Sequence, residues 1–406
     1  MSRSLGTPMK RSFLLAIAVA ACGDSTPPEQ YGFVALLGND TVSVERVQKS
    51  PKRLVTDGVD RFPFVRERHT EYDLKADGKI SHMVMNVRTP NGKTPAERGR
   101  TITANFSDQD VRISVRDSAG VRDTAFATGG AITVPHVSMV YSIIEHEIAT
   151  ALRQGAAAGM RAGDSVRFRQ FYPDRDVGPS FTLHEGWVFP KPEGKVELRH
   201  DWLSGWGDVA VDSSGRMLTY SGMRSTYKVA VRRTTALPDV ESIGKQFAAA
   251  EQTTGLKQLS VRDTARATIG AATFSVDYGR PLARGRSLLG EVINYDRVWR
   301  TGANAATQFT TSAPITLAGL SLPAGTYTLF TLPHPTNVEL IVNKQSGQWG
   351  TQYDRSRDLG KAPLKADSVQ APTEKFTIAI VPTDGKHGSL EMTWGTFRWT
   401  APIVVQ

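Results

Sequence analysis

The side chains best suited to bind a ligand lie in the last third of this 406-residue chain. Trp299 and Arg300 are adjacent, and neighbours on a strand face opposite ways, so we expect the ring in the core and the guanidinium toward a loop or partner. Arginine binds carboxylate and phosphate groups through two parallel hydrogen bonds. We therefore predict an anion-binding concavity formed by Arg280, Arg300, Asn304 and Trp349, with Trp299 beside it.

A structural role for these residues is the alternative. Arg280, Arg286 and Arg300 would then bind loop carbonyls and one buried carboxylate such as Asp296. Asn304 follows a glycine by two positions and would close a turn, since asparagine tolerates left-handed backbone. The sequence leaves both interpretations open.

The eight histidines do not form a metal motif, because no two have the three- or four-residue spacing that places zinc ligands on one helix face. Glu145–Glu147, with His146 at its centre, falls within a predicted helix, and we expect it on a solvated face. His184 and His200 are each followed by an acidic residue, and they would hold an ion only if the fold brought them to His146. We predict no metal and no cofactor.

The sequence has neither a Gly-x-Ser-x-Gly elbow nor a phosphate-binding loop, so we predict no catalytic residue. A binding or structural module for a lipid, a glycan or a protein is the favoured function. One alternative is a periplasmic hydrolase that uses Glu145, His146 or His184 as a base. Another is a carrier that shields acyl chains beneath the predicted helix, which requires a continuous apolar cavity between helix and sheet.

The only cysteine, Cys22, ends a segment typical of export. Residues 1–12 carry three positive charges, and residues 13–21 are an apolar run too short to span a bilayer. Val19–Cys22 is similar to a bacterial lipobox, in which the cysteine is acylated and becomes the N-terminus. We predict a signal peptide over 1–21, lipid attachment at Cys22 and a flexible tether over 22–30; ordinary cleavage near Ala21 is the alternative.

The residue after the cysteine is Gly23, whereas an aspartate there tends to retain lipoproteins in the inner membrane. We therefore predict a lipid anchor in the outer membrane of the bacterial envelope, facing the periplasm. The chain has a net charge of +9, of which residues 1–21 supply +3, and no Lys and Arg run with interleaved aromatic residues occurs. We expect the membrane, a small apolar or anionic ligand or an envelope protein as partners, and no nucleic acid.

Short alternating runs and turn pairs such as Asp77-Gly78 predict a mainly β protein. We expect an antiparallel meander over 31–236, curled around one helix at about 139–154 that Ser138 caps and Gly155 ends. A helix from Pro238 to about Ala250 and a linker follow, within 237–264. Residues 265–406 are predicted to form a sandwich-like β domain, in which 354–370 is a long loop.

Several motifs of this last part resemble the bacterial domain of unknown function 2911, in the order Asp277–Pro281, Gly285–Arg286, Val298–Asn304, Leu322–Phe330, Asn343–Lys344 and Gln348–Gly350. The resemblance covers about 267–403. It implies an exported bacterial protein, and no activity is established for the family. The chain departs from the pattern at Ala305, where the family usually has glutamate, so any acid or base role of that glutamate is lost here. The first half resembles no family.

Overall fold

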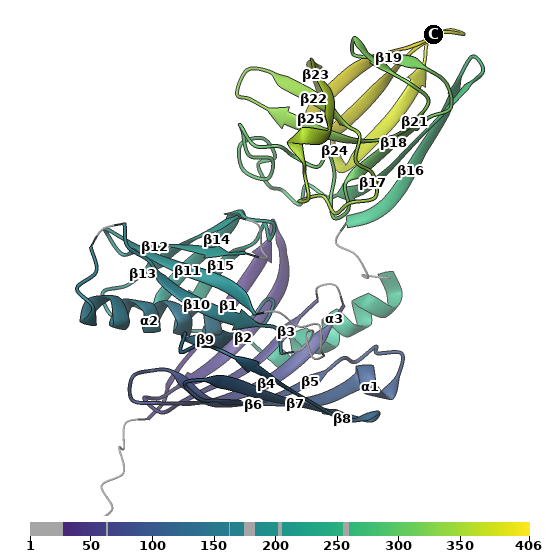
Figure 1. Cartoon of the computed structure of the whole chain (residues 1–406). Coiled ribbons are helices and arrows are strands. Elements are labelled where there is room, and N and C mark those ends of the chain that lie inside the picture. The colour runs from purple at the N-terminus through teal and green to yellow at the C-terminus, as the bar shows by residue number, and fades with distance from the viewer. Residues whose placement is uncertain (1–26, 62–63, 162, 174–182, 202–204, 255–259) are drawn as a thin grey trace, which may run out of the picture.

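The computed structural model describes residues 27–61, 64–161, 163–173, 183–201, 205–254 and 260–406 (Figure 1). The predicted fold class is confirmed: the chain is mainly β, with a curled sheet that packs one helix and then a sandwich-like part. We call residues 29–254 the N-terminal module and residues 260–406 the C-terminal module. The predicted signal peptide, Cys22 and most of the tether lie outside the described residues.

The N-terminal module contains one fifteen-stranded sheet in the order β8-β7-β6-β5-β4-β3-β2-β1-β15-β14-β13-β12-β11-β10-β9. Its strands are β1 (Glu29–Leu37), β2 (Asp40–Lys49), β3 (Arg53–Asp60), β4 (Arg66–Leu74), β5 (Ile80–Arg88), β6 (Gly99–Phe106), β7 (Asp110–Asp117), β8 (Gly120–Ala127), β9 (Thr133–Pro135), β10 (Val166–Phe171), β11 (His184–Lys191), β12 (Lys195–His200), β13 (Trp206–Val211), β14 (Met217–Arg224) and β15 (Ala230–Thr234). Neighbouring strands are antiparallel except β9 and β10, which are parallel.

The sheet curls because one of its faces must be buried. On β7, Val111, Ile113 and Val115 are buried and the residues between them are not, which is the alternation of a half-buried strand. The two ends of the sheet approach each other, since the ring of Phe126 on β8 lies 6.4 Å from that of Phe171 on β10. Helix α2 (Ser142–Ala157) occupies the space that the curl encloses (Figure 1).

The predicted helix exists, but both of its predicted ends are wrong. Ser138 is not the cap, because its hydroxyl lies 3.2 Å from that of Tyr227, and the helix begins four residues later. It also continues past Gly155 and ends in a Schellman motif, in which Gly159 has a φ of +64° and Met160 N–H donates to the Gly155 carbonyl at 3.0 Å.

Two further helices lie outside the curl. The short α1 (Pro95–Arg98), which the sequence analysis did not predict, begins with a capping box between Thr94 and Glu97. Helix α3 (Val240–Thr254) packs Val240 and Phe247 on the outer face of the sheet near β2 and β3. It includes most of the predicted linker, so the prediction that the helix ends near residue 250 is wrong.

The C-terminal module is built from two sheets that share one core. The first has the order β16-β17-β18-β21-β22-β23 and the second β20-β19-β25-β24. Their strands are β16 (Ser260–Ile269), β17 (Ala272–Pro281), β18 (Thr307–Thr311), β19 (Ile315–Leu317), β20 (Leu320–Leu322), β21 (Gly325–Pro333), β22 (Val338–Asn343), β23 (Asp358–Pro363), β24 (Lys365–Pro382) and β25 (His387–Val405), with a 3-10 turn, η1, at Arg355–Arg357.

The long loop predicted over 354–370 is not a loop. It contains η1, β23 and the start of β24, whose residues are mostly exposed. These edge segments are held by backbone pairing, for example Ile341 with Lys361, so they need few apolar side chains. No helix in the described part of the chain is long and apolar enough to cross a bilayer.

Candidate functional site

Arg280 and Trp299, two of the five predicted ligand-binding residues, are engaged within the C-terminal module. Arg280 on β17 donates to the Asp263 carboxylate at 2.8 Å, the Phe376 carbonyl at 3.1 Å and the Thr377 hydroxyl at 2.8 Å. Its guanidinium therefore ties β16, β17 and β24 together. This geometry matches the structural alternative for Arg280.

Trp299 packs against the core, as predicted, although it forms an isolated β-bridge with Thr331 and does not lie on a strand. Its ring is stacked on Trp394, with centroids 6.1 Å apart, and meets Phe376 edge-on at 5.1 Å. Its backbone N–H donates to the Thr331 carbonyl at 2.7 Å. These contacts fix the backbone from which the next residue, Arg300, projects.

Arg300, Asn304 and Trp349 lie on two loops that touch. The backbone N–H of Gly350 donates to the Asn304 carbonyl at 3.0 Å, and Trp349 forms a β-bridge with Ala305. A Cβ on Gly350 would lie 2.1 Å from Cδ of Arg300, so the aliphatic part of Arg300 crosses directly over this glycine. Asn304 has a φ of +63° and closes a turn, and Trp349 is half exposed.

Arg300 differs from the other predicted arginine in having no partner. Within the described residues its guanidinium has neither a hydrogen-bond acceptor nor a carboxylate partner, and burial lowers its pKa. The buried carboxylate proposed for it is not present at Asp296, which is exposed and lies 2.5 Å from His334. That part of the structural alternative is wrong because Asp296 points to a histidine at the surface.

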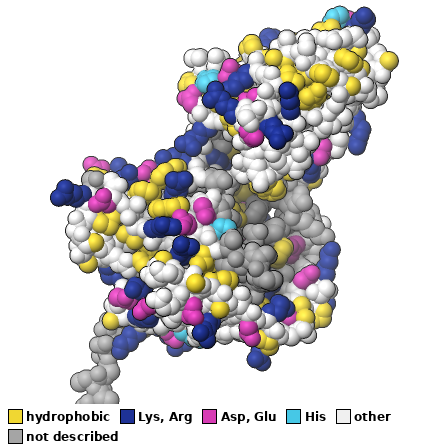
Figure 2. Space-filling view, viewed as in Figure 1, with side chains coloured by type: hydrophobic (Ala, Val, Ile, Leu, Met, Phe, Trp, Pro, Cys, Tyr) yellow, Lys and Arg dark blue, Asp and Glu magenta, His cyan; other side chains and the backbone are white. Residues whose placement is uncertain are grey.

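Five basic side chains gather where the two modules meet. We call Lys228, Arg284, Arg286, Arg297 and Arg300 the junction cluster. On the face shown in Figure 2, Lys and Arg side chains are frequent on the part of the C-terminal module nearest the N-terminal module. Only Lys228 comes from the N-terminal module, where it precedes β15.

Lys228 reaches across the junction. Its Nζ donates to the Met223 carbonyl of its own module, and to the Glu291 carbonyl at 3.4 Å and Oδ1 of Asn294 at 3.1 Å in the other module. All three acceptors are uncharged. Burial, followed by the charges of Arg300, Arg286 and Arg297, lowers the pKa of Lys228 to about 8.

The arginines of the junction cluster also have few negative partners. Arg286 donates to the Ala283 carbonyl at 3.0 Å and to the Leu282 carbonyl at 2.6 Å, so it does pin loop carbonyls. Burial, then the charge of Arg284, lowers its pKa to about 10. Exposed Arg297 has no ion-pair partner in the described part of the chain.

Two carboxylates lie beside the cluster. Asp40 pairs with Arg284, and Glu374 accepts the Arg284 backbone N–H at 2.9 Å and lies within electrostatic range of Arg286. The five basic side chains outnumber these two carboxylates, one of which, Asp40, is also 3.7 Å from Arg61. A surplus of positive charge attracts an anion, and guanidinium groups bind one in a fixed geometry.

Sequence reasoning missed Lys228, Arg284 and Arg297 as members of this cluster. The contacts of Lys228 across the junction join residues 63 and 66 positions apart in the chain. No local spacing connects a lysine before β15 with a loop of the following module. The sequence indicated only Arg286 and Arg300, which lie in the motifs Gly285–Arg286 and Val298–Asn304.

The three residues considered as hydrolytic bases lie elsewhere and not together. Glu145 and His146 are buried within α2, so the expected solvated face is wrong. Glu145 accepts from the Tyr31 hydroxyl at 2.8 Å and pairs with Arg233 at 2.5 Å. His146 lies 2.8 Å from the Gly78 carbonyl, and His184 lies 3.4 Å from Asp201; neither contact includes a nucleophilic hydroxyl.

His184 and His200 belong to one row of ring contacts, in which Tyr172 and His136 lie between them. His146 is not part of this row. The Tyr172 ring lies 5.1 Å from His184 and 5.3 Å from His136, which lies 5.2 Å from His200. Burial lowers the pKa of His200 to about 4, so it is a neutral ring at pH 7. Within the described residues no group of three or more potential ligands is arranged to hold a metal ion.

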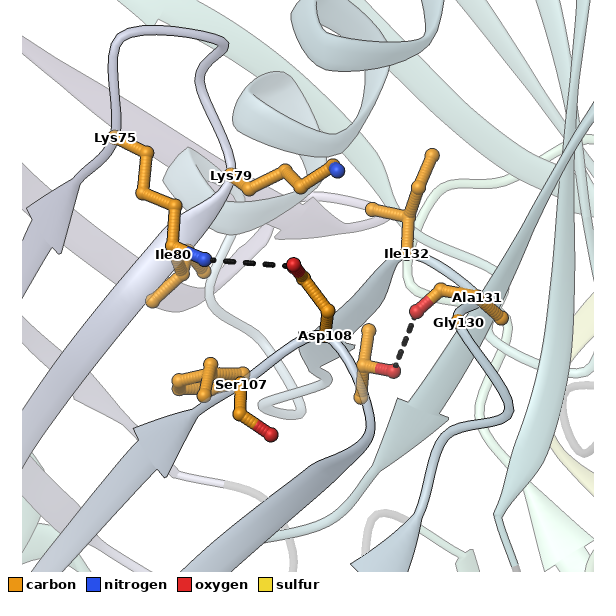
Figure 3. Close-up of a pocket in the computed structure, with 10 residues that line it drawn as sticks. Lys75, Lys79, Ile80, Ser107, Asp108, Gly130, Ala131 and Ile132 are labelled. Atoms are coloured by element: carbon orange, nitrogen blue, oxygen red, sulfur yellow. Dashed lines mark hydrogen bonds and ion pairs between the residues drawn. The ribbon is translucent and has the colours of Figure 1, made fainter.

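The space between α2 and the sheet is filled by side chains. Figure 3 shows a hollow between the β4–β5 and β6–β7 turns and the segment before β9, where Lys75 and Asp108 form a 3.6 Å ion pair. A second hollow lies beside Tyr141, Tyr220 and Tyr227. Each has a volume of about 20 Å³, which holds about one water molecule. Neither hollow has room for an acyl chain.

Comparison with known proteins identifies only the C-terminal module. Residues 260–403 match the family model of DUF2911, described as a protein of unknown function. The predicted resemblance to this family is thus confirmed, and it begins seven residues earlier than expected. The DUF2911 match includes Arg284, Arg286, Arg297 and Arg300 but not Lys228, which belongs to the N-terminal module. No curated protein matches the chain.

Two solved structures show weak similarity. A DUF1089 family protein from Pseudomonas aeruginosa is 13% identical over 46% of this chain and 93% of its own, with a TM-score of 0.32. A structure of botulinum neurotoxin type C is 8% identical over 92% of this chain and 84% of its own, with a TM-score of 0.12. Neither score is high enough to assign a fold.

Proposed function

We propose that this protein is a lipoprotein of the bacterial cell envelope that binds an anionic ligand without transforming it. An acyl group on Cys22 would hold it in the outer membrane, facing the periplasm, and the tether over 22–30 would separate the folded modules from the bilayer. Support for the anchor comes from the charged and apolar segment before the sole cysteine. Stable attachment needs more than one acyl chain at that residue.

The observation that carries the binding function is the state of Arg300. Its side chain is partly buried, which lowers its pKa, yet its guanidinium has no acceptor among the described residues. Burying a charge without a partner is costly, and an anion from solution would supply the missing acceptor. Other arginines of the same module meet carboxylates, as Arg262 does with Asp277 at 2.8 Å.

Titration of the full-length lipoprotein in neutral detergent with inorganic pyrophosphate tests this function. We expect Arg300→Met to weaken binding about tenfold, which is the loss of one charged hydrogen bond. The control Arg262→Met removes an arginine that already has a carboxylate partner and should change affinity less than about threefold. Arg300→Lys, which keeps the charge, should retain part of the affinity. Wild-type affinity in a folded Arg300→Met protein would overturn the proposal.

The anchor is tested by Cys22→Ser. We expect the variant to migrate on gels as the unprocessed, unacylated chain. Globomycin, which blocks lipoprotein signal cleavage, should give the same mobility change in the wild type. Unchanged mobility under both treatments would contradict lipid attachment.

A further inference from the structure

We propose that the junction cluster is a phosphoryl-binding site shared by the two modules, in which Lys228 and Arg300 contact the same phosphoryl group. This inference rests on the proposed function and goes further, because it names the ligand chemistry and gives the N-terminal module a part in binding. The consequence is that a bound ligand fixes the two modules to each other.

The charge of the cluster favours a phosphoryl group over a carboxylate. Lys228, Arg286, Arg297 and Arg300 have no carboxylate within hydrogen-bond distance in the described part of the chain, and Asp40, the partner of Arg284, is shared with Arg61 at 3.7 Å. Several positive charges are better balanced by a phosphate dianion or a diphosphate than by a single carboxylate. The planar guanidinium fork also matches phosphate oxygens.

The loop that carries the arginines is shaped before a ligand arrives. Non-glycine residues with left-handed backbone are uncommon, and four occur between positions 284 and 304: Arg284, Asp296, Thr301 and Asn304. Such conformations persist where the surroundings fix them, and they are frequent at binding sites. The loop holds Arg286, Arg297 and Arg300 within electrostatic range of Lys228, and Arg284 within range of Arg286.

The N-terminal module already touches this loop. The Asn39 backbone N–H donates to the Arg284 carbonyl at 3.0 Å, Asp40 pairs with the Arg284 guanidinium, and Lys228 bonds to Asn294. A Cβ on Gly38 would lie 2.1 Å from the Arg284 carbonyl oxygen. The β1–β2 turn can therefore pack against the loop only if residue 38 is glycine. The junction thus holds Lys228 in place, and a phosphoryl group would join its ammonium to the guanidinium groups opposite.

Hydrogen exchange of the full-length protein, followed by mass spectrometry with and without inorganic pyrophosphate, tests whether both modules contact the ligand. We expect slower exchange both in the segment 223–229 and in the loop 284–304. We also expect Lys228→Met to weaken pyrophosphate binding about tenfold. The control Lys191→Met removes a lysine paired with Glu197 at 2.9 Å in the same module and should have no effect on affinity.

Protection of 284–304 alone, with Lys228→Met binding like the wild type, would overturn the shared site while leaving the Arg300 site intact. Wild-type affinity in Arg300→Met would instead overturn the proposed function. Tighter binding of acetate than of phosphate would overturn the phosphoryl assignment.

Glycerol 3-phosphate and dihexanoyl phosphatidic acid separate the two sources of a phosphoryl group. Equal affinity supports a site for the phosphoryl group itself, and at least tenfold tighter binding of the lipid supports a lipid headgroup.

Discussion

Ionisable side chains in the interior around α2 and in the junction cluster have opposite surroundings. Around α2, Glu45, Glu145 and Glu147 are buried, and each has partners from the sheet or the helix. In the junction cluster, Arg300 is partly buried and Lys228 donates to uncharged acceptors, and neither has a carboxylate partner among the described residues. The first arrangement is complete and structural, whereas the second lacks an anion. The difference distinguishes charges that hold a fold from charges that await a ligand.

Glu45 offers the largest test of the complete interior. Its carboxylate accepts from the backbone N–H groups of Tyr141 and Ser142 at 2.9 and 3.1 Å and from the Ser142 hydroxyl, so β2 caps the start of α2. Glu45→Ala would leave these buried donors unpaired and should lower the free energy of unfolding by about 4 kcal/mol. Urea titration measures this. The control Glu241→Ala, an exposed partner of Arg46, should cost under about 1 kcal/mol.

Equal losses in the Glu45→Ala and Glu241→Ala proteins would contradict the capping role. They would also remove the contrast between the interior and the surface of this module.

Glu147 gives the next effect, and it depends on pH. Burial raises its pKa from 4.5 to about 8, although Gln170 Nε2, 3.0 Å away, opposes this. The native state therefore keeps a proton that the unfolded state releases, and this stability is lost as pH rises from about 4.5 to about 8. Between pH 5 and 7 the wild type should lose about 3 kcal/mol more than Glu147→Gln, which cannot titrate.

Denaturant titrations of both proteins across this pH range measure the effect. Parallel pH profiles for the wild type and Glu147→Gln would show that Glu147 is ionised in the native state.

Lys228 supplies a smaller, ligand-linked effect at the junction. Its pKa of about 8 means that raising the pH from 7 to 9 removes most of its charge, while Arg286, with a pKa of about 10, stays mostly protonated. Sulfate keeps its charge over this range, so its affinity should fall about tenfold in the wild type and stay constant in Lys228→Met. Calorimetric titration at fixed ionic strength measures it. A pH-independent affinity in the wild type would place the lysine outside the site.

Replacement of Arg297 has the smallest expected effect. It should stabilise the protein, whereas replacement of Glu45 in the interior should destabilise it. Because Arg297 is exposed and lies among like charges, Arg297→Gln should raise the free energy of unfolding by about 0.5 kcal/mol at low salt. The gain should vanish at 0.5 M salt, where surface charges are screened. Thermal unfolding at the two salt concentrations measures it. A loss of stability would mean that the cluster is already neutralised without a ligand.

The sequence predicted what local pattern controls. Residue alternation identified strands such as β5 and β14, and the repeat of apolar residues at 140, 144, 148 and 152 identified α2. It could not identify the capping of α2, because Glu45 is 97 positions from Ser142. The same limit applies to the site, since Arg280 and Arg300 look alike in sequence. Only tertiary contacts show that Arg280 meets Asp263 while Arg300 meets no acid in the part of the chain that the structure describes.

The pairing of β1 with β15 has a consequence for how the chain matures. Ala35 lies opposite Val231, so the first strand of the large sheet gains its second neighbour only when a strand nearly two hundred residues later is available. Contacts so distant in sequence slow folding, and a waiting strand exposes unpaired backbone that other chains can bind. During synthesis the N-terminal module would remain incomplete until residue 234 emerged. A holding chaperone would then shorten the interval in which misassembly competes with folding.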